Sequence, residues 1–188
     1  NRFYDHFGID PIGIVRSAIV LISTGQKKQG ASTITMQLAR NFFLTREKAY
    51  IRKVKEIFIA LHIEQLLSKD EILELYLNKI ELGHRAFGFG AAAQVYYGKS
   101  LNELNLAQMA MIAGLPKAPS ALNPIRNPER AKARRNVVLG RMLDEGFITQ
   151  ETFNETTSQP ITARFHGAEI DLYAPYISEM VRAEMVAR

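Results

Sequence analysis

The chain has 188 residues, of which 47% are hydrophobic and 23% are charged. This balance is typical of a folded globular protein and excludes a disordered chain. The absence of cysteine excludes disulfides, thiolate metal sites and a cysteine nucleophile. The formal net charge of +5 favours an acidic partner, such as nucleic acid, anionic lipid or a substrate that carries phosphates.

Signals for the ends of helices recur along the whole chain, whereas strand signals are nearly absent, so we expect a mostly α-helical protein. The clearest signals are Asp10-Pro11 with Gly25, the capping-box patterns Ser68 to Glu71 and Ser100 to Glu103, Asn127-Pro128 with Gly146, and the helix starts at Thr149 and Pro175.

The apolar run from Ile12 to Ile22 is interrupted by Arg16. It is shorter than the roughly 18 to 20 apolar residues that a membrane span requires. The run is therefore either a helix of the protein core or a helix that lies in a membrane surface, with Lys27 and Lys28 near lipid headgroups.

The segment QGASTITMQLARN, from Gln29 to Asn41, predicts a turn that leads into a helix. The free backbone N–H groups of such a helix start, together with Ser32 and Thr33, can bind an anion. Gln37 and Arg40 follow on the same helix. Taken singly, these side chains are also ordinary capping and surface groups.

A second helix is expected from about Glu47 to Leu67. Its apolar residues at spacings of three and four predict the buried face. They are Ile51, Val54, Phe58 and Leu61. Lys48, Arg52 and Glu56 follow one another at spacings of four and predict a separate polar stripe.

Glu56 has Arg52, Lys53 and Lys55 within one helical turn, which favours its ionised form and makes it a poor proton donor. It is better suited to hold a divalent cation, to orient a cationic side chain or to shape the charge around a leaving phosphate. A solvated face with ion pairs is the plainer alternative.

The segment from Leu115 to Pro124 must be a loop, because its prolines cannot donate helical hydrogen bonds. Within it, Lys117 is the candidate functional residue, although the segment could also be a simple connection.

These segments also match a known family. QGASTITMQLARN, RKVKEIFIALHIE, KDEILELYLNKIELG and AGLPKAPSALNP occur in the order and approximate spacing of the peptidoglycan glycosyltransferases, glycosyltransferase family 51. The chain resembles the glycosyltransferase domain of class A penicillin-binding proteins, and is most similar to the Gram-negative 1a type. FYDHFG, RRNVVLGRML and YAPYISEMVRAEM extend the match over essentially the whole chain.

The resemblance implies a mostly α, lysozyme-like, two-lobed domain with a cleft between a larger lobe and a smaller membrane-proximal jaw. Residues 1–165 would form this domain, truncated at its N-terminus, with the jaw at about 11–31. Residues 166–188 would form a C-terminal helix and the start of a linker toward a transpeptidase domain. Because the apolar run from Ile12 to Ile22 falls in the jaw, the resemblance favours membrane contact for it.

The activity that the resemblance implies is the polymerisation of lipid II into β-1,4-linked glycan strands, with inversion at the donor and release of undecaprenyl pyrophosphate. A divalent cation, Mg or Mn, is the implied cofactor. The implied partners are lipid II, the growing glycan strand, the membrane surface, moenomycin-type inhibitors and a regulatory lipoprotein, and no nucleic acid is expected. The implied location is the periplasmic face of the bacterial inner membrane, with an anchoring transmembrane helix upstream.

The family motifs carry over residue by residue. Glu56 matches the second glutamate, which assists the pyrophosphate or the metal. The expected substrate-binding residues are Phe3, His6, Ser32, Thr33, Gln37, Arg40, Lys48, Arg52, Lys53 and Lys117. The general-base glutamate of the first motif would fall just ahead of Asn1. If the sequence were complete, we would therefore expect an inactive fragment that still binds donor or inhibitor.

Two other functions were weighed. A lysozyme-like hydrolase or lytic transglycosylase needs a carboxyl with a raised pKa in an apolar pocket, which is the opposite of the surroundings of Glu56. A nucleic-acid-binding module needs a concentrated Arg/Lys stripe with interleaved aromatic residues, and no predicted helix has one.

Overall fold

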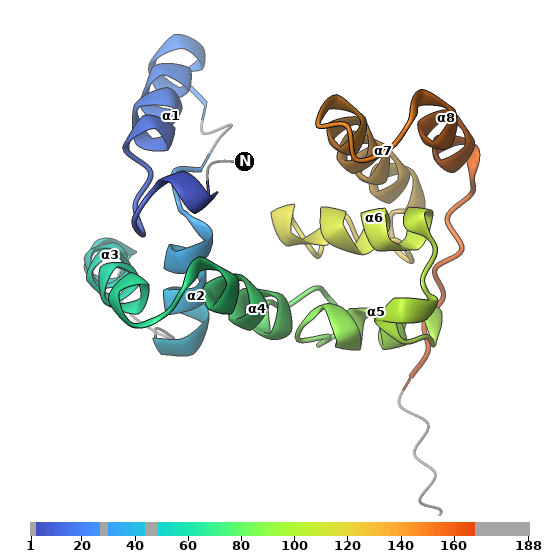
Figure 1. Cartoon of the computed structure of the whole chain (residues 1–188), viewed down its shortest axis with the longest axis horizontal. Helices are drawn as coiled ribbons and strands as arrows, with labels where there is room; N and C mark the ends of the chain where they lie inside the picture. The colour runs from blue at the N-terminus through green and yellow to red at the C-terminus, as the bar shows by residue number, and fades with distance from the viewer. Residues whose placement is uncertain (1–2, 27–29, 44–48, 168–188) are drawn as a thin grey trace, which may run out of the picture.

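The structure, a computed structural model, describes residues 3–26, 30–43 and 49–167 (Figure 1). Within these ranges the chain is helical, and its only β pairing is an isolated bridge between Glu81 and Phe87. The expectation of a mostly α protein is confirmed. The α-helices are α1 (Pro11–Thr24), α2 (Ile34–Phe43), α3 (Ala49–Leu66), α4 (Lys69–Lys79), α5 (Phe89–Tyr97), α6 (Leu106–Gly114), α7 (Pro128–Asp144) and α8 (Gln150–Ser158), and the 3₁₀ helices are η1 (Phe3–Asp5), η2 (Leu101–Glu103) and η3 (Leu115–Lys117).

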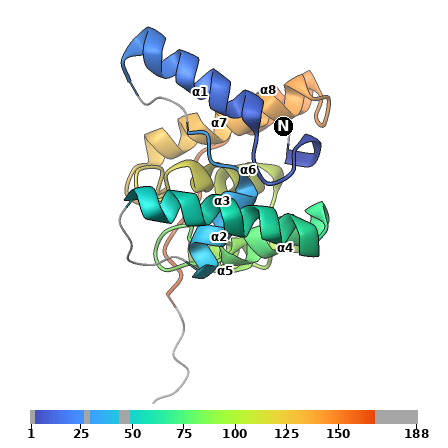
Figure 2. The ribbon, with the colours of Figure 1, turned by 90° about the vertical axis from the view of Figure 1, so that its left-hand side faces the viewer.

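The helices form two packed groups that a shared core connects. Helix α2 packs against α3 and α4, whereas α7 packs against α6 and α8. Helices α4 and α5 run along the base of the molecule, and α1 stands apart from the main body (Figures 1 and 2). The side chains of the core come from η1, from α2 and from α4 to α7, so one continuous apolar cluster holds the elements together.

Most helix ends lie where the sequence predicts them. Ser68 and Glu71 form the expected reciprocal capping box at the start of α4. The box of Ser100 and Glu103, in contrast, opens only the short η2. Asn105 supplies a further capping box with Gln108, which begins α6 and was not predicted. The predicted C-terminal helix and its Pro175 start lie outside the described residues.

Helix α1 has the expected ends, with Pro11 in its first turn and Gly25 as its left-handed C-cap. Its apolar side chains, however, point into solvent, and Gly13 is its only buried residue. Ile19 is 60% exposed and Ile22 is 85% exposed. The interpretation of this run as a core helix is therefore wrong.

The predicted buried face of α3 is also wrong. Ile51, Val54 and Phe58 are all more than half exposed, at 54%, 54% and 67%. The residues of α3 that the fold buries are instead Glu56, Ala60 and Glu64, which follow one another at spacings of four. Two carboxylates thus occupy the inner face of α3, where apolar periodicity predicts none.

The turn between α4 and α5 depends on a glycine. Gly88 has a φ of 88°, and a Cβ atom there would lie 2.6 Å from the backbone oxygen of Asn78. Its N–H also donates to the carbonyl of Ile80, so the backbone cannot easily move away. Only glycine fits this position without strain.

We therefore expect Gly88→Ala to lower the free energy of unfolding by about 2 kcal/mol or more, through strain and overpacking. Gly90→Ala is the matched control, because it lies in α5 with open space at its Cβ position. Chemical denaturation of both variants tests this, and equal stability of the two would contradict it.

Candidate functional site: a buried carboxylate among cations

Glu56 is the centre of the candidate site. Its side chain is 3% exposed and projects from the inner face of α3 toward α2. Ala60, one turn later, is fully buried and carries only a methyl group, so it takes up little space beside Glu56. A buried carboxylate needs charged or hydrogen-bonding partners, and α2 and α3 supply them.

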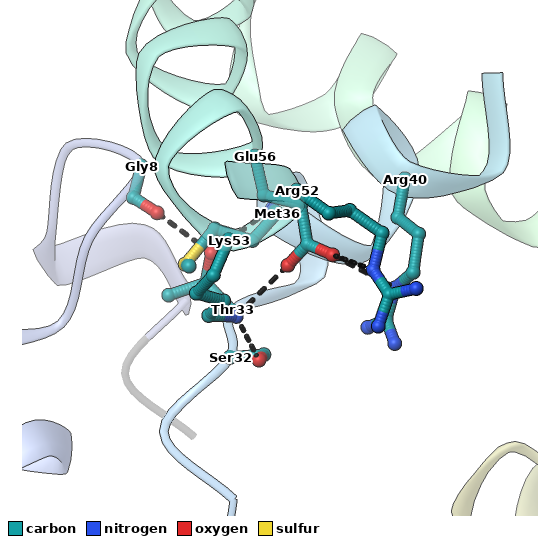
Figure 3. Close-up of polar contacts among 8 residues, drawn as sticks. All are labelled: Gly8, Ser32, Thr33, Met36, Arg40, Arg52, Lys53 and Glu56. Carbon is teal, nitrogen blue, oxygen red and sulfur yellow. Dashed lines mark hydrogen bonds and ion pairs between the residues drawn. The ribbon is translucent and has the colours of Figure 1, made fainter. Parts of the chain in front are cut away.

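Three cationic side chains surround this carboxylate. Lys53 Nζ lies 2.9 Å from Glu56 Oε2, and the Nε atoms of Arg40 and Arg52 lie 3.4 Å and 3.7 Å from Oε1. Figure 3 shows the two guanidinium groups on one side of the carboxylate and Lys53 on the other. We call Arg40, Arg52, Lys53 and Glu56 the cation cluster.

The charges of the cation cluster do not cancel. Three positive groups face a single carboxylate, which leaves an excess of two positive charges. The cationic side chains are 35% to 43% exposed, so a ligand in solvent can reach them. Glu56 orients them from its buried position. Such a group favours an anion that carries more than one negative charge.

Lys53 connects the cation cluster to the segment that begins α2. Its ammonium donates to Ser32 Oγ at 2.6 Å as well as to Glu56. The next residue, Thr33, donates through Oγ1 to the carbonyl of Gly8 at 2.6 Å and accepts from the N–H of Met36. The two hydroxyls therefore join the helix start to a cation on α3 and to the N-terminal segment.

A cavity of about 300 Å³ lies beside this helix start. Its walls come from η1, α1 and the residues that lead into α2. The lining residues are Phe3, His6, Asp10, Gly13, Arg16, Gly30, Ala31, Ser32, Thr33, Ile34 and Gln37. We call it the jaw pocket, because α1 and residues 30–31, which line part of it, belong to the segment predicted as the jaw.

The structure brings most of the predicted site residues into these two neighbouring places. Arg40, Arg52, Lys53 and Glu56 form the cation cluster. Five others line the jaw pocket, namely Phe3, His6, Ser32, Thr33 and Gln37. Their roles toward a substrate remain predictions.

Of the two remaining predicted residues, one lies apart from this assembly and the other is not described by the structure. Lys117 ends η3 and is exposed, and no hydrogen bond or ion pair joins it to the cation cluster in the part of the chain that the structure describes. Lys48 lies outside the described residues.

Sequence reasoning missed Arg16 and Asp10 as pocket residues. A signal for Arg16 was present, because it is the only charge in the apolar run from Ile12 to Ile22. Asp10 was recognised only as the entry to a helix, although its side chain folds over Gly13, where an added Cβ would lie 2.5 Å from Oδ2.

The residues around Glu56 do not fit a divalent metal site. Both of its oxygen atoms face cations, and a metal ion there would add to an existing excess of positive charge. Elsewhere among the described residues, no group of three His, Cys, Asp or Glu side chains could hold a metal. The expectation of Mg or Mn as a cofactor stays a prediction.

We expect Arg52→Ala to weaken the binding of inorganic pyrophosphate by about tenfold, because it removes one charge-assisted contact. Arg141→Ala is the matched control, since Arg141 pairs with Asp144 at the surface of α7. Calorimetric titration of both variants measures the effect, and equal affinities would contradict an anion site at the cation cluster.

Comparison with known proteins agrees with this geometry. The Transglycosylase family profile matches residues 1–143. Penicillin-binding protein 1A of Escherichia coli is 62% identical over all 188 residues, which cover 22% of that protein. Penicillin-binding protein 1A of Pseudomonas aeruginosa is 55% identical over the same length, which covers 23% of that protein.

A solved structure shows the same resemblance. The crystal structure of penicillin-binding protein 1A from Haemophilus influenzae matches with a TM-score of 0.54 and 46% sequence identity, over 82% of this chain and 20% of that one. The chain thus spans about a fifth of the length of the relatives it matches. The profile match and the sequence identities lead to one conclusion: the chain belongs to the transglycosylase family found in penicillin-binding proteins 1A.

Proposed function

We propose that this chain is the glycan-polymerising domain of a peptidoglycan glycosyltransferase, which joins lipid II units by β-1,4 bonds and releases undecaprenyl pyrophosphate. The observation that carries this proposal is the cation cluster around buried Glu56, with an excess of two positive charges over the single carboxylate. Membership of the transglycosylase family supports it.

In this reaction a sugar hydroxyl attacks the anomeric carbon of the donor with inversion. The general base of the family's first motif takes the hydroxyl proton, and the bond to the diphosphate breaks. Negative charge grows on the departing diphosphate, so preoriented cations lower the barrier. Arg40, Arg52 and Lys53 are the cations that stabilise this negative charge. Glu56 acts through these cations, because its ion pairs hold their guanidinium and ammonium groups in position before the substrate binds.

The surroundings of Glu56 argue against hydrolysis of finished glycan. A glycoside hydrolase needs a protonated carboxyl that donates to the leaving oxygen, typically in an apolar pocket. Glu56 instead lies between Lys53 and two arginines, so its oxygen atoms face cations and not an apolar pocket. It therefore serves an anionic leaving group better than a neutral sugar.

The jaw pocket is the proposed binding site for the sugar that is attached to the diphosphate. Its lining combines polar groups, such as His6, Ser32 and Gln37, with the ring of Phe3. Sugars bind through hydrogen bonds to hydroxyls and through contact with apolar ring faces. Ser32 belongs to the pocket and also accepts from Lys53, so the sugar and the diphosphate would meet there.

Membrane contact through α1 completes the proposal. No described helix is both long enough and apolar enough to cross a bilayer. The exposed isoleucines of α1 fit instead a helix that lies in the interface, where polyprenyl substrates reside. From the family resemblance we further propose that the domain works at the periplasmic face of the bacterial inner membrane, with moenomycin-type inhibitors and a regulatory lipoprotein as partners.

We expect Glu56→Gln to lower the rate of lipid II polymerisation by about 100-fold, because the cations lose their anchor. Stability should change little, since the three cationic side chains reach water. The assay uses the full-length protein. A turnover close to that of the unaltered protein would contradict the role of Glu56.

For the membrane contact, we expect Ile22→Lys to weaken the binding of the chain to lipid vesicles by at least about tenfold. Val137→Lys adds the same charge at a 52% exposed position of α7 and should bind as the unaltered chain does. Vesicle flotation measures both. Equal binding of the two variants would exclude α1 as the contact.

A further inference from the structure

The segment from Phe3 to Gly8 forms one wall of the jaw pocket and is fastened at several points. Thr33 donates to the carbonyl of Gly8, and Gly8 itself, at a φ of 72°, lies close to the backbone of Ala60. Tyr4 donates to Asp70 at 2.9 Å. Further points of attachment involve a single ammonium group, that of Lys69.

The ammonium group of Lys69 contacts three oxygen atoms. Its Nζ lies 2.7 Å from each carboxylate oxygen of Glu64, and it donates to the carbonyl of His6 at 2.6 Å. Two of these contacts are hydrogen bonds from Nζ, and the third is an ion-pair contact with the second oxygen of Glu64. The same group lies 4.7 Å from the centre of the Phe3 ring, a favourable cation–π distance.

Glu64 connects this wall to the opposite one. Its side chain is 2% exposed, and its Oε1 accepts from Thr35 Oγ1 at 2.6 Å. Thr35 is fully buried on α2, two residues beyond Thr33. The contacts thus run from the His6 carbonyl through Lys69 and Glu64 to the start of α2, which carries the other wall.

We propose that Glu64 and Lys69 form a clasp that sets the spacing of the two walls of the jaw pocket, and so are positioning residues for glycosyl transfer. This inference rests on the proposed function. The clasp touches neither the cation cluster nor the pocket interior, and it acts through Phe3, His6 and Thr35.

The position of Lys69 in its helix supports a specific role. It is the first residue of α4, where the helix dipole disfavours a cation. A residue that only stabilised the helix would be better acidic there. The gain comes from the contacts with Glu64 and His6, which lie outside the helix.

The decisive variant is the double change Glu64→Gln with Lys69→Met. Lys69→Met alone strands a buried carboxylate and should lower the thermal midpoint. The double variant removes both charges and should recover most of that midpoint, since glutamine can still accept from Thr35. It leaves the His6 carbonyl without its donor, so the wall is released while the fold persists.

For the double variant we expect a polymerisation rate reduced by at least about tenfold, because small displacements of bound groups are costly. Pyrophosphate affinity should stay unchanged, since the cation cluster is intact. Lys69→Arg, which keeps charge and donors, should retain more activity than Lys69→Met. Amide hydrogen exchange should accelerate in residues 3–9 and remain unchanged in α7.

Unchanged exchange in residues 3–9 of the double variant would overturn the clasp, whatever the activity. A double variant with the unaltered polymerisation rate would also overturn it, as would a parallel loss of pyrophosphate affinity. If the unaltered protein fails to polymerise lipid II, the proposed function fails instead, and the exchange measurement still decides the clasp.

Discussion

The burial of Glu56 is the constraint on which the candidate site depends. A carboxylate that is 3% exposed must be compensated, and its partners come from two helices, Arg40 on α2 and Arg52 and Lys53 on α3. The packing of α2 on α3 therefore fixes where the cations lie. Because one carboxylate cannot neutralise three cations, the same contacts that stabilise the helix pair leave a surface prepared for an anion.

Helix α3 is built in the reverse of the usual amphipathic pattern. Glu56 and Glu64 face inward, whereas Ile51, Val54 and Phe58 face outward. Along the inner face, pairs of opposite charge and hydrogen bonds add to the apolar contacts of Ala60 and Ile63. Partners such as Thr35 and Lys69 must therefore be placed with directional accuracy, which makes the arrangement of α2, α3 and α4 more specific than apolar contact alone would require.

This inversion explains what the sequence could and could not predict. Capping signals are local, so Ser68 and Gly25 correctly marked the ends of α4 and α1. The family motifs also named all four members of the cation cluster. The buried face of α3 was missed because apolar periodicity assumes a hydrophobic interior. Glu64 was overlooked because its partners Thr35 and Lys69 lie on other helices, although its spacing of eight from Glu56 places it on the same face.

The two buried carboxylates of α3 differ in the charge and the exposure of their partners. Among the described residues Glu64 pairs with one cation, that of Lys69, whose side chain is 19% exposed. This pair is therefore balanced and mostly shielded from solvent. Glu56 meets three cations that are 35% to 43% exposed, so that group is unbalanced and open. An open excess of charge is completed by a ligand, whereas a closed pair fixes geometry. Two turns of one helix thus separate the open cation cluster, the proposed site of the diphosphate, from the closed pair that we propose as the clasp of the neighbouring pocket.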